Sequence, residues 1–150
     1  MRKFVCSILT TALLAVGGGS VFASSGSLDK TINPLYGVPY KAAGKSTYGF
    51  DCSGFTGYVF GALGAKLPAS SSAQFEIGES VDREDLKPGD LVFFNTNGRS
   101  ISHVGIYIGN NMFAHSETGI GVTKTSLDDP YYWSKKYVGA KRVAIPEMED

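Results

Sequence analysis

The chain has 150 residues, of which 14 are basic and 14 are acidic, giving a formal net charge of zero. This length suits one ordinary domain with its own hydrophobic core and is too short for two. The balanced charge excludes the strongly basic surface with which proteins bind nucleic acid or anionic membranes, so we expect neither partner.

The first 23 residues have the layout of a secretory signal peptide. Arg2 and Lys3 give a positive start, an apolar run extends from Phe4 to Val16, and small residues lead up to Ala23. The run is shorter than the roughly 20 consecutive apolar residues that cross a bilayer, and its layout is that of a segment removed after export. We therefore expect cleavage after Ala23, no membrane span, and a secreted protein of the periplasm or the cell wall.

Cysteine is scarce in the expected mature chain. Cys6 lies within the predicted signal peptide, which leaves Cys52 as the single cysteine of an exported protein. Exported proteins usually pair their cysteines, so an odd one indicates a free reactive thiol, an intermolecular disulfide or a small buried apolar residue. The count alone does not separate these interpretations, and the surroundings of Cys52 have to decide.

The remaining chain divides into a short linker and one domain. Residues 24–33 are rich in Ser and Gly and predict a linker, residues 34–146 form the predicted domain, and residues 147–150 form a tail. A helix is predicted from Asp51 onwards, because apolar residues recur from there at the spacing of one helix face. Asp51 is a suitable N-cap, so Cys52 falls in the first turn of this helix.

Antiparallel strands are predicted in the second half of the chain. Residues 91–94 form a short apolar run suited to a buried strand, and residues 103–108 alternate between apolar and other side chains. Residues 109–111 (Gly-Asn-Asn) signal a turn, after which residues 112–116 return as the next strand. A helix followed by several antiparallel strands makes an α+β domain.

Cys52 and the two histidines of the chain, His103 and His115, are the residue types of a cysteine nucleophile with its base. A thiol attacks a carbonyl as the thiolate, and a helix N-terminus and a histidine both favour that charged form. A third polar group should hold the histidine in the right tautomer. On this reasoning either histidine could be the base, and a histidine in a strand could equally be structural.

The predicted hairpin places the two histidines relative to each other. If the loop is the three residues 109–111, Gly105 lies opposite His115, and His103 lies diagonally across the same face. A two-residue loop would put the histidines on opposite faces, and the apolar pattern favours the longer loop. Cys52 and both histidines could also bind Zn²⁺ together with a water. They lack closely spaced ligand pairs, however, so we expect no metal and no other cofactor.

Three motifs follow one another along the chain: DCSGF at 51–55, LKPGDLVFF at 86–94 and SHVGIYIG at 102–109. Together they resemble the NlpC-type cell-wall peptidases, which are papain-like cysteine enzymes of bacteria. The resemblance extends from about Tyr36 to Val143, and the order and spacing of the motifs make it specific.

The resemblance implies a papain-like fold, in which a helix bearing the nucleophile packs on an antiparallel sheet bearing the histidines. It implies that Cys52 is the nucleophile, that His103 is the base and that His115 orients the base. The choice between the histidines therefore comes from the resemblance.

The resemblance also covers the surroundings of the nucleophile. Tyr40 matches a tyrosine that helps to hold the oxyanion, and Asp51 and Ser53 match positions that bind the free amine of the stem peptide in some members. Two departures, Ala43 where paired glycines are usual and Ala69 where an arginine is usual, lie near the expected substrate groove. These departures bear on which substrate is preferred, while the catalytic residues are intact.

The predicted activity is that of an exported, monomeric cysteine peptidase that acts on the stem peptides of peptidoglycan. The bond from D-γ-glutamyl to the diamino acid is the first expectation, and the cross-link from diaminopimelate to D-Ala is the alternative. A wall-binding module without turnover and an acyltransferase that uses the same thiol are rival interpretations.

Overall fold

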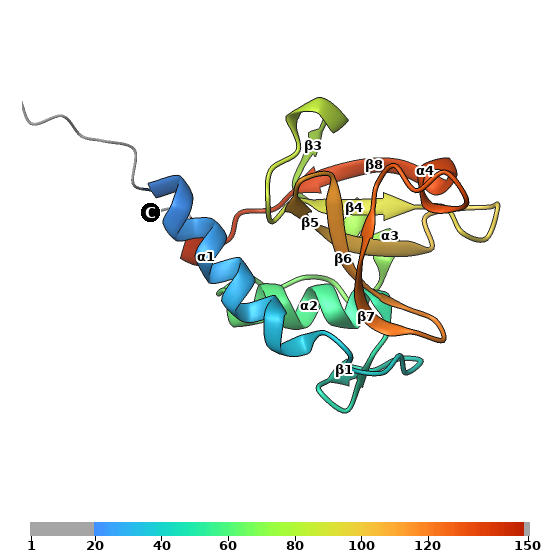
Figure 1. Ribbon diagram of the computed structural model, residues 1–150, viewed down its shortest axis with the longest axis horizontal. Coiled ribbons are helices and arrows are strands. Elements are labelled where there is room, and N and C mark those ends of the chain that lie inside the picture. The colour runs from blue at the N-terminus through green and yellow to red at the C-terminus, as the bar shows by residue number, and fades with distance from the viewer. Residues whose placement is uncertain (1–19, 149–150) are drawn as a thin grey trace, which may run out of the picture.

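The computed structural model describes residues 20–148 of the chain. Helices lie around an antiparallel sheet (Figure 1), and the predicted α+β class is confirmed. Residues 1–19 of the expected signal peptide and residues 149–150 of the expected tail lie outside the described residues. Within residues 20–148, no helix is both long and apolar enough to cross a membrane.

The helices and strands have the following bounds. The α-helices are α1 (Ser20–Ile32), α2 (Cys52–Ala62), α3 (Ser71–Phe75) and α4 (Trp133–Lys136). Short 3₁₀ turns are η1 (Asn33–Leu35), η2 (Arg83–Asp85) and η3 (Pro146–Met148). The strands are β1 (Lys45–Ser46), β2 (Gly49–Phe50), β3 (Glu79–Val81), β4 (Leu91–Phe94), β5 (His103–Gly109), β6 (Met112–Glu117), β7 (Gly121–Ser126) and β8 (Tyr137–Arg142).

Six strands form one sheet in the order β3-β8-β4-β5-β6-β7, and every neighbouring pair in it is antiparallel. β1 and β2 form a separate small hairpin ahead of α2. In the view of Figure 1, α2 lies below the sheet, α1 runs diagonally from the left of the sheet down to α2, and α4 lies beside the upper edge of the sheet. The helix that carries Cys52 therefore packs on an antiparallel sheet, as predicted.

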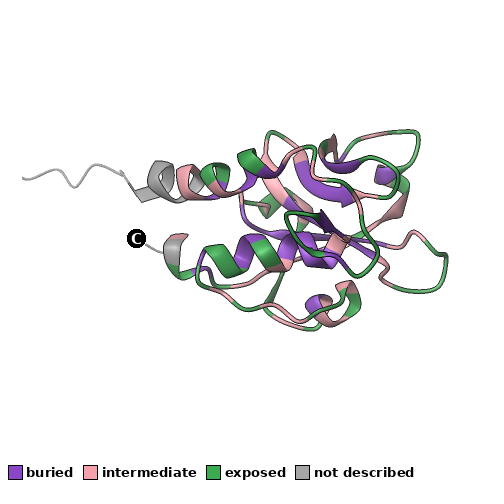
Figure 2. Cartoon of the chain, turned by 90° about the horizontal axis from the view of Figure 1, so that it is seen from below, coloured by how far each residue is buried: buried purple, intermediate pink, exposed green. Residues whose placement is uncertain are grey.

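Hydrophobic side chains cover both faces of the sheet, so the buried residues gather at the centre of the molecule (Figure 2). The face toward α1 and α2 carries the larger core, in which Phe55 and Phe60 of α2 meet Phe93 and Ile106 of the strands. The opposite face carries a smaller, aromatic cluster. Its buried members are Val92, Phe94, Phe113, Leu127, Trp133 and Ala140.

The structure differs from the linker predicted for residues 24–33. Helix α1 continues to Ile32, and both Leu28 and Ile32 are buried in the larger core. The two residues are four apart and share one helix face, which packs against the core. Met148, in the predicted tail, packs against the same core. Both ends of the described chain therefore take part in the fold.

The β5–β6 hairpin has the predicted pairing. Ile106 lies opposite Ala114, and a Cβ atom added to Gly105 would lie 3.2 Å from the Cβ of His115. The same alignment puts His103 and His115 on one face of the sheet. The register that was predicted from the apolar pattern is therefore confirmed.

The turn of this hairpin is shorter than predicted. Asn110 and Asn111 form a two-residue turn with φ values of 52° and 59°, and Gly109 pairs with Met112. On its own such a turn would shift the pairing by one residue and separate the histidines. A bulge at Ile108 takes up one residue and restores the predicted register.

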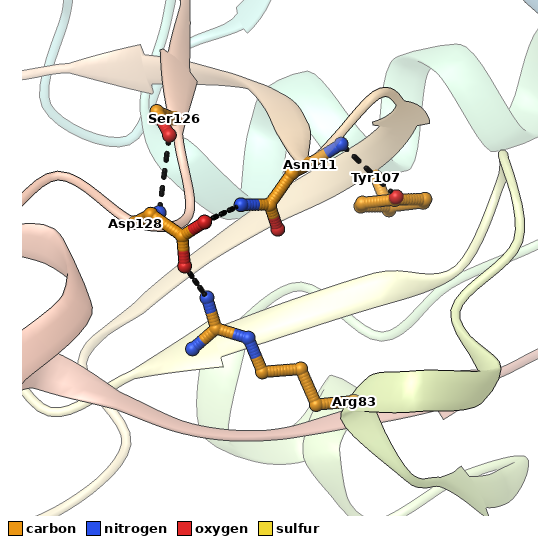
Figure 3. Close-up of polar contacts among 5 residues, drawn as sticks. All are labelled: Arg83, Tyr107, Asn111, Ser126 and Asp128. Atoms are coloured by element: carbon orange, nitrogen blue, oxygen red, sulfur yellow. Dashed lines mark hydrogen bonds and ion pairs between the residues drawn. The ribbon is translucent and has the colours of Figure 1, made fainter.

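Polar contacts join this turn to neighbouring segments (Figure 3). The side-chain amide of Asn111 donates to the Asp128 carboxylate, with which Arg83 forms an ion pair of 2.6 Å. The backbone N–H of Asn111 donates to the Tyr107 hydroxyl at 3.1 Å. These groups are largely exposed, so they align the turn with η2 and the loop after β7 more than they add stability.

The segment between α1 and α2 runs very close to the start of α2. The carbonyl oxygen of Gly44 accepts a hydrogen bond from the Asp51 N–H at 3.1 Å. A Cβ atom on Gly54 would lie only 1.9 Å from that oxygen, so this contact requires glycine. Ala43, which precedes Gly44 in the chain, has a φ of 59° and lies in the left-handed region that favours glycine.

Ala43→Gly is expected to stabilise the protein by about 1 kcal/mol, because glycine adopts this backbone conformation without the steric cost that alanine has. Urea unfolding of both proteins measures the difference. Ala42→Gly is the matched control, since Ala42 is not among the described residues with positive φ. The control should lower or leave unchanged the free energy of unfolding, and equal effects of the two substitutions would contradict this explanation.

Candidate active site

Cys52 is the first residue of α2, as predicted. The carboxylate of Asp51 accepts a hydrogen bond from the Gly54 N–H at 2.6 Å and caps the helix. The Cys52 side chain is half-buried at the margin of the larger core and is a free thiol. It therefore lies at the helix end where unpaired N–H groups point outward.

The pKa of the Cys52 thiol is raised in this structure. Burial is the largest cause, and the negative charge of Asp51 acts in the same direction. The backbone N–H groups of Val104, Ser53 and Cys52 itself favour the thiolate and partly offset these effects. The N–H groups at the helix end therefore favour the thiolate, but burial outweighs them in the resting protein. A base must take the proton before the sulfur can attack.

His103 and His115 lie in direct contact. The Nε2 atom of His103 is 2.8 Å from the Nδ1 atom of His115, and the two rings are nearly perpendicular, with an interplanar angle of 89°. His103 begins β5 and His115 lies in β6, and both side chains are buried. Because Nε2 of His103 is engaged with His115, Nδ1 is the nitrogen that remains for another partner.

Helix α2, which begins at Cys52, packs against β5, which begins at His103. The backbone N–H of Val104, the residue that follows His103, lowers the pKa of the Cys52 thiol, so the thiol lies near the N-terminal end of β5. Val104 belongs to the core on the α2 side, whereas the His103 ring contacts Phe94 and Trp133 on the other side. The thiol and the imidazole thus approach the end of the strand from its two faces. The structure brings His103 and His115 together and places the helix of Cys52 against the strand that begins at His103.

Burial keeps both histidines neutral. It lowers the pKa of His103 to about 4. Burial, followed by the adjacent His103, lowers the pKa of His115 to about 2. Both rings therefore carry one proton at neutral pH, and each offers one donor and one acceptor nitrogen.

Two residues of the site were missed by the sequence analysis. Thr125 in β7 has its hydroxyl oxygen 2.9 Å from Nε2 of His115. The Trp133 ring lies 4.8 Å from the centroid of each histidine ring and covers the pair. Nothing in the local sequence pattern marks either residue, because both reach the histidines only through the folding of the last third of the chain.

The remaining predicted residues surround the start of α2. Tyr40 pairs with Phe50, so it runs beside the segment that leads into Cys52. The buried Ser53 hydroxyl donates to the Ala69 carbonyl oxygen at 3.0 Å and lies 3.3 Å from the Asp51 carboxylate. The side chains of Asp51 and Ser53 are therefore both engaged in contacts that hold the loop and the helix together.

A cleft of about 490 Å³ begins at Ser53 and runs along the outer side of α2. Its lining includes Tyr58, Lys66 and Ala69. Ala69 is the position at which the family resemblance leads to the expectation of an arginine. A slightly larger hollow of about 540 Å³ lies at β3 and η2, among residues that do not contact Cys52 or the histidines. Neither hollow is lined by Cys52 or a histidine, but the first contains Ser53, the neighbour of Cys52 in the first turn of α2, and is therefore the one closer to the site.

The zinc alternative finds no support in the geometry. Within residues 20–148, no three His, Cys, Asp or Glu side chains converge so that they could hold a metal ion. The ring nitrogens of His103 and His115 face each other at 2.8 Å and form a hydrogen bond. Nitrogens that share one Zn²⁺ would each lie about 2 Å from the ion and direct their lone pairs at it.

Comparisons with known proteins place the chain among cell-wall enzymes of related sequence. An Escherichia coli protein named murein DD-endopeptidase MepS/murein LD-carboxypeptidase is 47% identical over 108 residues, which cover 71% of this chain and 56% of that protein. A Bacillus subtilis gamma-DL-glutamyl hydrolase is 37% identical over 145 residues, which cover 94% of this chain and 34% of that protein. The chain thus spans about half or less of the length of these two relatives.

A solved structure shares the fold. The crystal structure of an NlpC/P60 family protein from Bacillus cereus superposes with a TM-score of 0.73 at 39% identity, covering 79% of this chain and 39% of that one. A sequence profile described as the NlpC/P60 family matches residues 37–142, which contain the helix of Cys52 and the strands of both histidines. With the fold, the motifs and the profile in agreement, the chain belongs to the NlpC/P60 family.

Proposed function

We propose that this protein is a cysteine peptidase that hydrolyses peptide bonds in peptidoglycan. The observation that carries the proposal is the 2.8 Å contact between His103 and His115 at the strand end that Cys52 reaches. This contact fixes one nitrogen of His103 and leaves the other for the thiol. The relatives named as murein endopeptidase and glutamyl hydrolase support the substrate class.

The residues account for both halves of the reaction. Nδ1 of His103 takes the thiol proton of Cys52, and the sulfur attacks the carbonyl carbon of the peptide bond. The oxyanion that forms is stabilised by the Cys52 N–H at the helix end and by the Tyr40 hydroxyl. The imidazolium then gives its proton to the leaving amine, which departs and leaves a thioester. A water, activated by the same nitrogen, hydrolyses the thioester to a carboxylic acid and restores the thiol.

His115 orients His103 in this mechanism. Because the pKa of His115 is about 2, its ring stays neutral while His103 cycles through its charged form. Nδ1 of His115 can therefore accept a hydrogen bond from Nε2 of His103 throughout and stabilise the imidazolium. For Asp51 and Ser53 we propose a substrate-binding role in addition to the helix-capping contacts, in line with the family resemblance.

Two bonds in the stem peptide are candidates for cleavage. The relative named gamma-DL-glutamyl hydrolase favours the expected bond from D-γ-glutamyl to the diamino acid. The relative named murein DD-endopeptidase favours the cross-link between diaminopimelate and D-Ala. Either substrate lies outside the cytoplasm, which agrees with the export that the sequence predicts; we further propose that the protein is a monomer.

Digestion of purified sacculi with the mature protein tests the function. Mass spectrometry of the products separates the two bonds. Cleavage after D-γ-glutamyl shortens the stems and releases peptides that begin with the diamino acid, whereas cleavage of the cross-link converts dimeric muropeptides to monomers. Cys52→Ala is the control. Binding to sacculi without any new product would instead support a wall-binding module, and a new amide in the presence of an added amine would support an acyltransferase.

A further inference from the structure

The environment behind His115 contains two groups that the proposed mechanism does not use. Thr125 pairs with Phe113 across β6 and β7, so it lies diagonally from His115 on the same face of the sheet. Its Oγ1 atom is 2.9 Å from Nε2 of the fully buried His115. The carboxylate of Glu117, at the end of β6, lies 3.8 Å from the same nitrogen. Two oxygens thus converge on the nitrogen of His115 that faces away from His103.

The contacts from His103 to His115 to Thr125 allow two arrangements of protons. In the first, Nε2 of His103 donates to Nδ1 of His115, and Nε2 of His115 donates to the Thr125 hydroxyl. In the second, every hydrogen bond is reversed, so that Thr125 donates to His115 and His103 carries its proton on Nδ1. Only the first arrangement leaves a lone pair on Nδ1 of His103, where the thiol proton has to go.

Charge favours the first arrangement. The side chain of Glu117 is 27% exposed, whereas that of His115 is 0% exposed, so the carboxylate faces a buried ring. A negative charge beside Nε2 attracts an N–H and repels a lone pair. Asp129, whose charge also acts on Glu117, adds to the negative potential on this side. The hydroxyl of Thr125 can accept as well as donate, so it adapts to the direction that the charge sets.

We propose that Thr125 is a positioning residue for the hydrolysis: together with the Glu117 carboxylate it keeps the proton of His115 on Nε2, and thereby leaves Nδ1 of His103 free for the thiol proton. This inference rests on the proposed function for its kinetic consequence. The arrangement of protons itself is a property of the resting protein and can be observed without substrate.

Kinetics of two variants separate the hydroxyl from the shape of the side chain. Thr125→Val keeps the branched shape but removes the acceptor, and it is expected to lower kcat by about tenfold to a hundredfold with KM unchanged. Thr125→Ser keeps the hydroxyl and is expected to retain kcat within about threefold. A role in packing alone predicts the opposite order, with serine as the more harmful change.

Two-bond ¹H–¹⁵N correlation spectra observe the tautomers directly. The chain has only two histidines, so four ring nitrogens have to be assigned. In the wild type, Nε2 of both rings is expected to carry the proton, and Nδ1 of both to carry a lone pair. Thr125→Val and Glu117→Gln are each expected to show a second form with the proton on Nδ1.

The spectra and the kinetics distinguish a failure of the proton assignment from a failure of the proposed function. A wild-type spectrum with the proton on Nδ1 of either ring overturns the inference, as does wild-type kcat in Thr125→Val together with an unchanged spectrum. If the expected spectrum is found in a protein that leaves sacculi intact, the proposed function fails while the assignment of the protons stands. Urea unfolding of each variant confirms that the differences arise in the folded protein.

Discussion

Replacing Cys52 by alanine is expected to lower the rate of peptidoglycan cleavage by about a thousandfold or more. The thiol is the group that forms the covalent bond, and the described neighbours offer no second nucleophile in its place, since Ser53 is buried and bonded to Ala69. The cap of α2 is made by the Asp51 carboxylate and the Gly54 N–H, so the substitution leaves the helix start unchanged. Release of soluble muropeptides from sacculi measures the rate.

Cys52→Ser gives a stricter comparison, because it keeps a nucleophilic atom in nearly the same place. A hydroxyl gives up its proton far less readily than a thiol, and a buried imidazole whose pKa is about 4 is a weak base for it. We therefore expect this variant to be almost as slow as the alanine variant. Substantial activity in Cys52→Ala would remove Cys52 from the mechanism.

The stability of the protein is expected to fall by about 3 kcal/mol for each of its two histidines, about 6 kcal/mol in all, as the pH falls from 6.5 to 4. His103 takes up a proton near pH 6.5 in the unfolded chain, but only near pH 4 in the fold, because burial penalises its charged form. Between these values the unfolded state binds more protons, so lowering the pH favours unfolding. His115, with a pKa of about 2, acts in the same direction. Urea unfolding at several pH values measures the slope.

Variants of the histidines show which groups make the free energy of unfolding depend on pH. His103→Gln removes one titrating group and is expected to reduce the loss of stability between pH 6.5 and 4 by roughly half, whatever it does to the stability at pH 7. The chain has 14 Asp and Glu residues whose carboxyls titrate toward the lower end of this range, so the difference in slope between the wild type and His103→Gln, rather than the slope itself, measures the contribution of His103. A free energy of unfolding that stays constant from pH 7 to 4 would show that the rings are not buried as neutral groups.

The parts of the site that could be predicted are those that local patterns determine. The N-cap at Asp51 and the helical spacing after it place Cys52 in a first turn, and the alternation along β5 and β6 places His103 beside His115. These features depend on periodicity within about a dozen residues. The bulge at Ile108 was missed, yet the prediction of register held, because the burial of apolar side chains decides which residues pair.

The parts that could not be predicted depend on packing between distant segments. Thr125 reaches His115 only because β7 pairs with β6 at the edge of the sheet. Trp133 reaches both histidines only because α4 packs on the same face of the sheet as their rings. The raised pKa of the Cys52 thiol results from burial, which outweighs the effect of the helix end that the sequence does indicate. Helix α1 packs on the domain through Leu28 and Ile32, in a segment whose composition is that of a linker.

Because of the bulge at Ile108, β5 contains one residue more than a regular hairpin with the same turn would need. If Ile108 were deleted, the ladder could become regular while Ile106 still lay opposite Ala114, so the histidines would remain together. Strand β6 has no extra residue between the turn and His115, so deleting one residue there would shift the pairing. Insertions and deletions in this hairpin should therefore be tolerated unequally on its two strands, even though both strands carry a residue of the same site.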